Sequence, residues 1–348
     1  MKQIKMLAKS ATLVVTSLML LSSCKKDNND NTVVTADVLV SCEGPFGSGT
    51  GTISKISLDS NAVQNNAFET ANGFPLGNIV QSVSVFNDRA YIVVNNAHKV
   101  EVATASTLTS VGRITGLVYP RSFLGISEQK GYITMWGSTG GKVMVIDLTT
   151  LQVTDSIPCG YGSESMIKKG KFVYVTNAGD FINSDNTVTV IDSETDEVET
   201  TITVGKNSTG IVQDNDGKLW VLCNGTFGSL DGSLVRISTT SNTADLTIPI
   251  NLDSYQARLT INKAKNKLFF SVGDKTFAHS ISSTTFDNNA FIPRGFYAVA
   301  IDPNSDILYC ADAKDFISDG TVIRYDLTTT VAIDSFQTGL IPGNFFFN

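Results

Sequence analysis

The sequence is poor in the residue types on which most enzyme chemistry depends. It contains two histidines, His98 and His279, which excludes a histidine-rich metal site and leaves few candidates for acid–base catalysis. No Gly-x-Ser-x-Gly nucleophile motif occurs, and the glycines of "FGSGTGT" are not followed by the lysine and helix of a phosphate-binding loop. These absences predict a protein that is not an enzyme, and no cofactor is expected.

Basic residues are also in deficit. Lysine and arginine number 26 against 33 aspartates and glutamates, which gives a net charge of −7, and they form no basic stripe. Binding to the phosphates of a nucleic acid needs such a stripe. We therefore expect no nucleic-acid partner.

Cysteine pairs of the Cys-x-x-Cys type are absent as well. Beside Cys24, the chain has Cys42, Cys159, Cys223 and Cys310. In an exported protein four thiols permit disulfides. Three of them sit at the ends of apolar strand patterns, however, where cysteine is commonly a small buried hydrophobic residue, so their pairing stays open.

The first 24 residues have the pattern of a bacterial export signal. Lys2, Lys5 and Lys9 precede an apolar run over residues 11–21 that is too short to span a bilayer as a helix. The run ends in Leu-Ser-Ser-Cys, which resembles a lipobox and predicts acylation of Cys24. We expect a lipoprotein signal peptide over 1–24 and a lipid anchor to a membrane, the alternative being an ordinary signal peptide with a chance cysteine.

A polar stretch follows the predicted lipid-bearing cysteine. Residues 25–36 begin with a run of polar residues that has no periodic apolar pattern. This composition predicts a flexible tether. The sequence Cys-Lys-Lys-Asp at 24–27 resembles the export tag of Bacteroidetes-type lipoproteins. This resemblance implies an outer-membrane lipoprotein exposed on the cell surface.

Residues 37–348 lack sustained helical periodicity and consist of short runs rich in β-branched and aromatic residues. One run recurs with a large aromatic residue at intervals of 40 to 49 residues, marked by Tyr91, Tyr132, Tyr174, Trp220, Phe269 and Tyr309. A partner strand follows each copy, then a third segment, and a fourth precedes the next copy. Four short strands in each unit of about 40–45 residues are typical of the blades of a β-propeller.

The unit count predicts how the propeller closes. Seven marker strands indicate seven blades, but the first blade has no inner strand of its own, whereas "NFFFN" at 344–348 is a surplus strand. We therefore predict an all-β, seven-bladed propeller over 37–348, with four-stranded antiparallel blades and a C-terminal strand that completes the first blade. A two-sheet β-sandwich would explain neither the seven units nor the missing and surplus strands.

Four of the units share a long loop with an aromatic residue between the second and third strands. On a ring, their blades (1, 4, 5 and 7) form two neighbouring pairs, which we expect to be two facing walls. Connections between blades bring further aromatic residues to the same face, together with polar residues at strand ends. The predicted ligand-binding residues are Phe46, Tyr119, Trp136, Tyr161, Asn177, Phe181, Asn224, Phe227, Tyr255, Tyr297, Asp312 and Phe316. The alternative for each loop phenylalanine is packing against its own blade.

The repeat "VYVTNAGDFINSDNTVTVIDS" in the fourth unit resembles the YncE-like propellers, and the resemblance extends over about 37–348. With the lipobox, the acidic tether, "EGPFGSGTGT" and "IPGNFFFN", the chain is similar to surface lipoproteins of Bacteroidetes type, including the cobalamin-capturing propellers of the BtuG kind. The resemblance implies a corrinoid ligand on the aromatic face and a TonB-dependent outer-membrane transporter as partner.

Two other functions fit the same residues. One is an adhesion or interaction propeller for a glycan or a protein. The other is a lactonase-like hydrolase, in which Glu43, Asn177, Asn224 and Asp312 would converge on a central divalent ion.

Overall fold

A computed structural model describes residues 37–137, 139–180, 182–251 and 257–348. The predicted signal peptide with Cys24, the tether, Phe181 and Tyr255 lie outside the described residues. Within these ranges, no helix is both long enough and apolar enough to cross a membrane.

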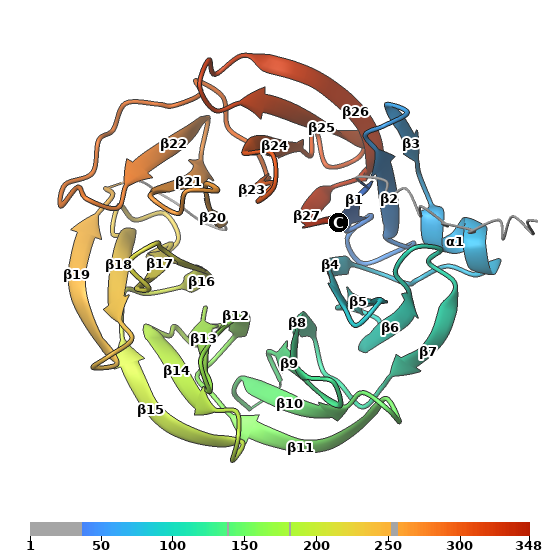
Figure 1. Cartoon of the computed structure of the whole chain (residues 1–348), viewed down its shortest axis with the longest axis horizontal. Helices are drawn as coiled ribbons and strands as arrows, with labels where there is room; N and C mark the ends of the chain where they lie inside the picture. Colours follow the sequence, from blue (N-terminus) through green and yellow to red (C-terminus); the bar gives the residue numbers. More distant parts are fainter. Residues whose placement is uncertain (1–36, 138, 181, 252–256) are drawn as a thin grey trace, which may run out of the picture. The chain divides into compact units, whose positions relative to one another are not determined.

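The described residues form a ring of seven antiparallel sheets, as predicted (Figure 1). From the centre outward, the first three blades are β27 (Pro342–Phe347), β1 (Asp37–Cys42), β2 (Thr52–Ser57) and β3 (Ala62–Gln64); β4 (Val80–Phe86), β5 (Arg89–Val94), β6 (Lys99–Thr104) and β7 (Ser110–Ile114); and β8 (Pro120–Ser127), β9 (Lys130–Met135), β10 (Lys142–Asp147) and β11 (Gln152–Pro158).

The other four blades continue around the ring in chain order. They are β12 (Ser163–Lys169), β13 (Phe172–Asn177), β14 (Thr187–Asp192) and β15 (Glu197–Thr203); β16 (Ser208–Gln213), β17 (Leu219–Cys223), β18 (Ser233–Ser238) and β19 (Thr243–Pro249); β20 (Leu259–Ile261), β21 (Lys267–Val272) and β22 (Lys275–Ser280); and β23 (Ala298–Ile301), β24 (Ile307–Asp312), β25 (Asp319–Asp326) and β26 (Ala332–Leu340).

The C-terminal strand closes the ring. β27 pairs antiparallel with β1, with Val38 opposite Phe347 and Val40 opposite Phe345. In Figure 1 the C-terminus accordingly lies beside β1. The prediction is confirmed, and the pairing removes the open sheet edge that an incomplete first blade would leave.

The sixth blade departs from the four-strand pattern because it has three strands in the described residues. After β22 the chain contains Asn288, Asn289 and Pro293, which interrupt strand alternation, and only an isolated bridge joins Thr276 to Ile292. Phe286 packs at this place against the ring of Phe277, 5.4 Å between centroids. Aromatic packing thus covers the blade where the fourth strand was expected.

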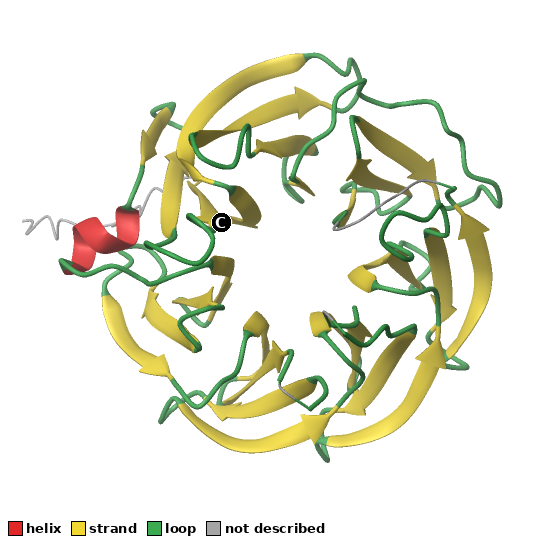
Figure 2. Cartoon of the chain, turned by 180° about the vertical axis from the view of Figure 1, so that it is seen from behind, coloured by secondary structure: helices red, strands yellow, loops and turns green. Residues whose placement is uncertain are grey.

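A short helix, α1 (Ala67–Asn72), joins the first two blades and lies at the edge of the ring (Figure 2). It was not predicted, because six residues are too few to show helical periodicity. Phe68 on this helix is fully buried and meets Phe74 edge to face at 5.4 Å. The helix therefore seals the outside of the first two blades.

The recurrent aromatic residues are buried in the cores between neighbouring blades. All six are at most 1% exposed, and each belongs to the second strand of its blade. Tyr91 stacks on Phe123 of the next blade at 3.7 Å, and Tyr174 Oη donates to Asn242 Oδ1 of the next blade at 2.6 Å. Burying one large apolar side chain stabilises the folded state by about 1.5–3 kcal/mol. The recurrent aromatic residues therefore stabilise each blade and its contact with the next blade.

The four described cysteines are free. Cys42, Cys223 and Cys310 are buried in the apolar cores, and Cys159 is partly buried. Burial raises the pKa of Cys42 to about 11 and that of Cys223 to about 12. These cysteines are packing residues. The sequence left their pairing open, and in this structure all four described thiols are free.

The ring has two faces, which are made by different connections between strands. The loop after β1 meets the connection between the first two blades, where Gly51 N donates to Gly77 O at 2.9 Å and Asn78 Nδ2 to Pro45 O at 2.8 Å. We call this side, with the loops between second and third strands and the connections between blades, the loop face. The opposite side, made of the remaining hairpin turns, is the turn face.

Candidate functional site

The loop face carries most of the exposed apolar side chains. Of twelve large hydrophobic residues that are exposed among the described ones, eight lie on this face and the other four on or beside outermost strands. The eight are Phe46, Tyr119, Tyr161, Ile182, Phe227, Leu230, Phe316 and Ile317. Large exposed apolar patches often mark interaction or ligand-binding sites, whereas single exposed apolar residues are normal, so the informative feature is that these residues share one face.

Three of the predicted loop phenylalanines project from the loop face. Phe46 is 86% exposed, Phe227 74% and Phe316 53%. Aspartates shape two of these loops: Asp231 Oδ1 accepts from Thr226 N at 2.6 Å, and Asp315 Oδ1 accepts from Ser318 N at 2.7 Å. Hydrogen bonds to its loop also lower the pKa of Asp315 to about 2. Aspartate hydrogen bonds thus help to hold the turns that carry Phe227 and Phe316.

The predicted tyrosines of the inter-blade connections are half-exposed. Tyr119 has a left-handed backbone with φ 49° and meets His98 edge to face at 4.8 Å. The backbone N–H of Tyr161 donates to Asp185 Oδ2 at 2.9 Å. Both rings are thus placed by neighbouring loops, with part of each ring open to solvent.

The structure does not bring the two predicted asparagines to the surface. Asn177 is fully buried and its Nδ2 donates to Thr187 Oγ1 at 2.9 Å, while Asn224 is 1% exposed and its Nδ2 donates to Thr209 Oγ1 at 2.8 Å. Both are the residues at or just after the end of a second strand, where the side chain turns sideways to join elements instead of facing outward. Asp312 is more accessible, and it pairs with Arg294 at 2.5 Å.

Sequence reasoning missed a charged group on the inner strands. Arg121 holds Glu164 with two hydrogen bonds of 2.7 Å each and donates to Gln81 Oε1 at 2.6 Å. Each of these three is the second residue of the inner strand of its blade, in blades 2, 3 and 4. The sequence signal that could have identified them is this shared position, which holds a long polar side chain in all three blades.

Two predicted residues join the same group. Trp136 Nε1 donates to Glu164 Oε2 at 3.0 Å, and the Arg121 guanidinium lies 4.6 Å over the indole ring. Tyr297 Oη donates to Glu43 Oε1 at 3.0 Å. We call Glu43, Gln81, Arg121, Trp136, Glu164, Arg258 and Tyr297 the central cluster.

The charges of the central cluster balance. Arg258 Nη2 lies 3.6 Å from Glu43 Oε1, so two arginines face two glutamates. Burial nevertheless raises the pKa of Glu43. It also raises the pKa of Tyr297, which stays protonated and donates to that carboxylate. The cluster is a rigid polar site between exposed apolar loops.

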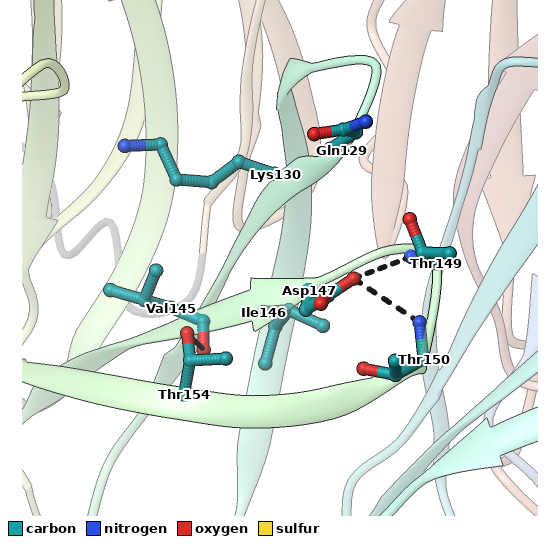
Figure 3. Close-up of a pocket in the computed structure, with 8 residues that line it drawn as sticks. All are labelled: Gln129, Lys130, Val145, Ile146, Asp147, Thr149, Thr150 and Thr154. Carbon is teal, nitrogen blue, oxygen red and sulfur yellow. Dashed lines mark hydrogen bonds between the residues drawn. The ribbon is translucent and has the colours of Figure 1, made fainter.

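Two depressions lie on opposite faces. One, of about 420 Å³, lies on the loop face between blades 6 and 7 and includes Tyr297, Asp312, Lys314 and Phe316. The other, of about 360 Å³, lies on the turn face of blade 3 (Figure 3). There Asp147 Oδ1 accepts from Thr149 N at 2.7 Å and from Thr150 N at 3.1 Å, so this carboxylate serves the turn.

The predicted metal-binding arrangement of the hydrolase alternative is not found. In the described ranges, no three His, Cys, Asp or Glu side chains come close enough to hold a metal ion. Glu43 bonds to Tyr297, the two asparagines are buried between strands, and Asp312 pairs with Arg294. His279 is buried against Trp220 at 5.8 Å.

The fold and the arrangement of these residues define a seven-bladed β-propeller whose loop face carries exposed apolar side chains around a charged centre. The chain belongs to a family described as "Domain of unknown function (DUF5074)", whose model matches residues 37–347. Among curated proteins, nothing matches the chain.

Solved structures with the same fold are distant in sequence. A quinonprotein alcohol dehydrogenase-like protein from Bacteroides thetaiotaomicron is 14% identical, with a TM-score of 0.68 over 90% of this chain and 78% of that one. The periplasmic gluconolactonase of Pseudomonas aeruginosa is 11% identical, with a TM-score of 0.65 over 90% and 98%. Hydrazine synthase of Kuenenia stuttgartiensis is 16% identical, with a TM-score of 0.59 over 76% and 88%. At these identities the likeness shows the fold alone.

Proposed function

We propose that the protein is a non-catalytic binding protein that holds a large organic molecule on its loop face. The observation that carries this is the placement of eight of the twelve exposed hydrophobic residues on that face, around the central cluster. Such a surface suits a ligand with both apolar area and many hydrogen-bonding groups.

The central cluster supports binding over catalysis. Arg121 and Glu164 satisfy each other through two hydrogen bonds, and Glu43 accepts from Tyr297, so the groups are fixed in position. A nucleophile would need a neighbouring base within hydrogen-bond reach, and no such Ser–His or Cys–His pair occurs among the hydrogen bonds of the described part of the chain.

The finer part of the proposal concerns ligand and location. The N-terminal sequence with Cys24 supports export as a lipid-anchored, surface-exposed protein of the outer membrane. Cobalamin is the ligand we propose to test first, because a corrin has a wide apolar face with amide groups at its edge. A TonB-dependent transporter would then receive it.

A retention experiment tests this proposal. Full-length protein, purified in mild detergent, is mixed with cyanocobalamin at micromolar concentrations and passed over a size-exclusion column. Co-elution of the red chromophore is expected, and its loss in a Phe46→Ala, Phe227→Ala double variant. Val331→Ala is the matched control, since Val331 is 62% exposed but lies beside an outermost strand.

The results separate the two levels of the proposal. Absence of co-elution with the unchanged protein would exclude cobalamin. Retention that is equal in the double variant and the wild type would overturn the loop face as the binding surface.

A further inference from the structure

The depression between blades 6 and 7 has the composition of a ligand site of its own. Its volume of about 420 Å³ falls within the usual range of small-molecule pockets, about 300–1,000 Å³. Gly273 and Gly295 are among its lining residues, and their backbones pack so closely that a Cβ atom on Gly295 would lie 1.9 Å from Gly273 O. The space exists because blade 6 has a short turn at the point where its neighbour has a long loop.

The walls combine one exposed ring with opposite charges. Phe316 stands edge to face on Tyr297 at 5.7 Å and remains 53% exposed. Asp312 accepts from Arg294 Nη2 at 2.5 Å and, through its other oxygen, from Lys314 N at 2.8 Å. The Lys314 ammonium itself has no hydrogen-bond or ion-pair partner among the described residues. Donors and acceptors thus stand beside an apolar ring.

A second loop of the chain has glycine at the position that corresponds to Lys314. The loops "NAGDF" in blade 4 and "DAKDF" in blade 7 align without a gap and are identical at three of five positions, and Lys314 stands where the other loop has Gly179. Both positions are left-handed, with φ 50° for Lys314 and 75° for Gly179. The matching turn therefore accommodates glycine at this position, and the backbone does not require the lysine side chain.

We propose that this depression binds one neutral sugar ring of a glycan. Sugar hydroxyls both donate and accept, which suits the Asp312 carboxylate and the Lys314 ammonium together. The C–H face of a pyranose packs on an exposed aromatic ring such as Phe316. A charged ligand fits less well, since Asp312 and nearby Asp274 oppose an anion and Arg294 and Lys314 oppose a cation.

The site shares Tyr297 with the central cluster and Phe316 with the exposed apolar residues of the loop face, but its charged residues Asp312 and Lys314 belong to neither set, and the two proposals are tested with different ligands. Failure of cobalamin to bind would therefore leave it unaffected. Failure of sugar binding would likewise leave the large-ligand proposal unaffected.

Ligand-observed NMR with full-length protein in detergent tests the site. The probes are maltotriose, cellotriose and mannotriose, with trigalacturonate as the acidic counterpart. We expect saturation transfer to at least one neutral trisaccharide, at least tenfold stronger binding of it than of trigalacturonate, and a roughly tenfold loss in Lys314→Gly and in Phe316→Ala. Val331→Ala should bind as the wild type does.

Lys314→Gly keeps the test interpretable, because the matching loop already holds glycine at this position and the variant should fold at least as stably as the wild type. Saturation transfer to none of the neutral sugars would overturn the proposal. So would tighter binding of trigalacturonate, or equal binding by wild type and Lys314→Gly when thermal denaturation shows both folded.

Discussion

The two faces of the propeller are made by the same strands but differ in what they leave exposed. On the turn face, Asp147 and Asp326 accept hydrogen bonds from the amides of the short turns that follow them, and no large hydrophobic side chain projects from the turn of Asp147. On the loop face, Asp231 and Asp315 do the same for longer loops, whose tips present Phe227 and Phe316.

The difference shows that loop length, more than turn chemistry, decides how much apolar surface each face exposes. A short turn has few residues beyond those that its aspartate holds. A longer loop is held in the same way and has further residues at its tip, where Phe227 and Phe316 remain largely exposed. The central cluster combines both features. Its side chains are held by hydrogen bonds, as the turns are, and they lie close to the loop face.

The largest effect should come from breaking the central cluster. Arg121→Ala leaves the Glu164 carboxylate, 13% exposed, without its bidentate partner. Losing one member of a buried pair costs about 3–5 kcal/mol, so we expect a fall of about 3 kcal/mol in the free energy of unfolding, measured by urea denaturation.

Arg113→Ala is the control for that measurement. Arg113 is 53% exposed and lies 3.9 Å from Glu101, a buried carboxylate that keeps Lys99 at 2.8 Å and Ser110 at 2.7 Å as partners, so we expect a loss of no more than about 1 kcal/mol. Equal losses in the two variants would show that the central cluster is no more important to folding than an exposed arginine beside a carboxylate that has other partners.

A smaller effect, on binding alone, is expected at the loop tips. Phe227→Ala should weaken retention of the ligand about tenfold, which is about 1.4 kcal/mol. Because the ring is 74% exposed, its removal should change the free energy of unfolding by no more than about 0.5 kcal/mol. Titration of ligand and urea denaturation measure the two quantities, and a large loss of stability would mean that the ring is a packing residue.

Glu43→Gln should change how stability depends on pH. Burial raises the pKa of Glu43 in the folded protein, so the folded state binds more protons than the unfolded one above the unfolded pKa of about 4.3. Stability therefore falls as pH rises from there through the folded pKa. The Glu43→Gln variant should lack this decline, so its free energy of unfolding should increase relative to that of the wild type as pH rises. Denaturation curves between pH 4 and 8 that stay parallel for the two proteins would contradict this.

The smallest effect is expected on the turn face. Turn amides lower the pKa of Asp147, so its contribution is present above the unfolded pKa of about 3.9 and is lost as pH falls through the folded value. Asp147→Ala should slightly lower the midpoint of thermal denaturation at pH 7, with the difference vanishing in acid. Ligand retention should not change, and a change would break the division between the faces.

Much of the fold could be read from the sequence because it repeats. Tyr91, Tyr174 and Trp220 recur where each blade needs a large buried side chain, and the surplus C-terminal strand matches the missing one in blade 1. The missing strand of blade 6 could not be read, because its segment is replaced by the packing of Phe286, a contact between residues not related by the repeat.

The site could be read only in part. Exposure of Phe46 and Phe227 follows from loops whose other residues are small and polar. The direction of Asn177 does not follow, because the same residue type at a strand end can face solvent or, as here, bond to Thr187 and Thr189. Composition cannot distinguish these cases.

The sequence by itself determined seven blades, their closure by the last strand and the presence of aromatic loops on one face, because these depend on local patterns repeated along the chain. Only the tertiary structure decided that Arg121, Glu164, Glu43 and Tyr297 meet at the centre. Glu43 and Tyr297 are 254 positions apart. Closing a ring brings together residues from distant blades, and no local pattern records which side chains then face each other.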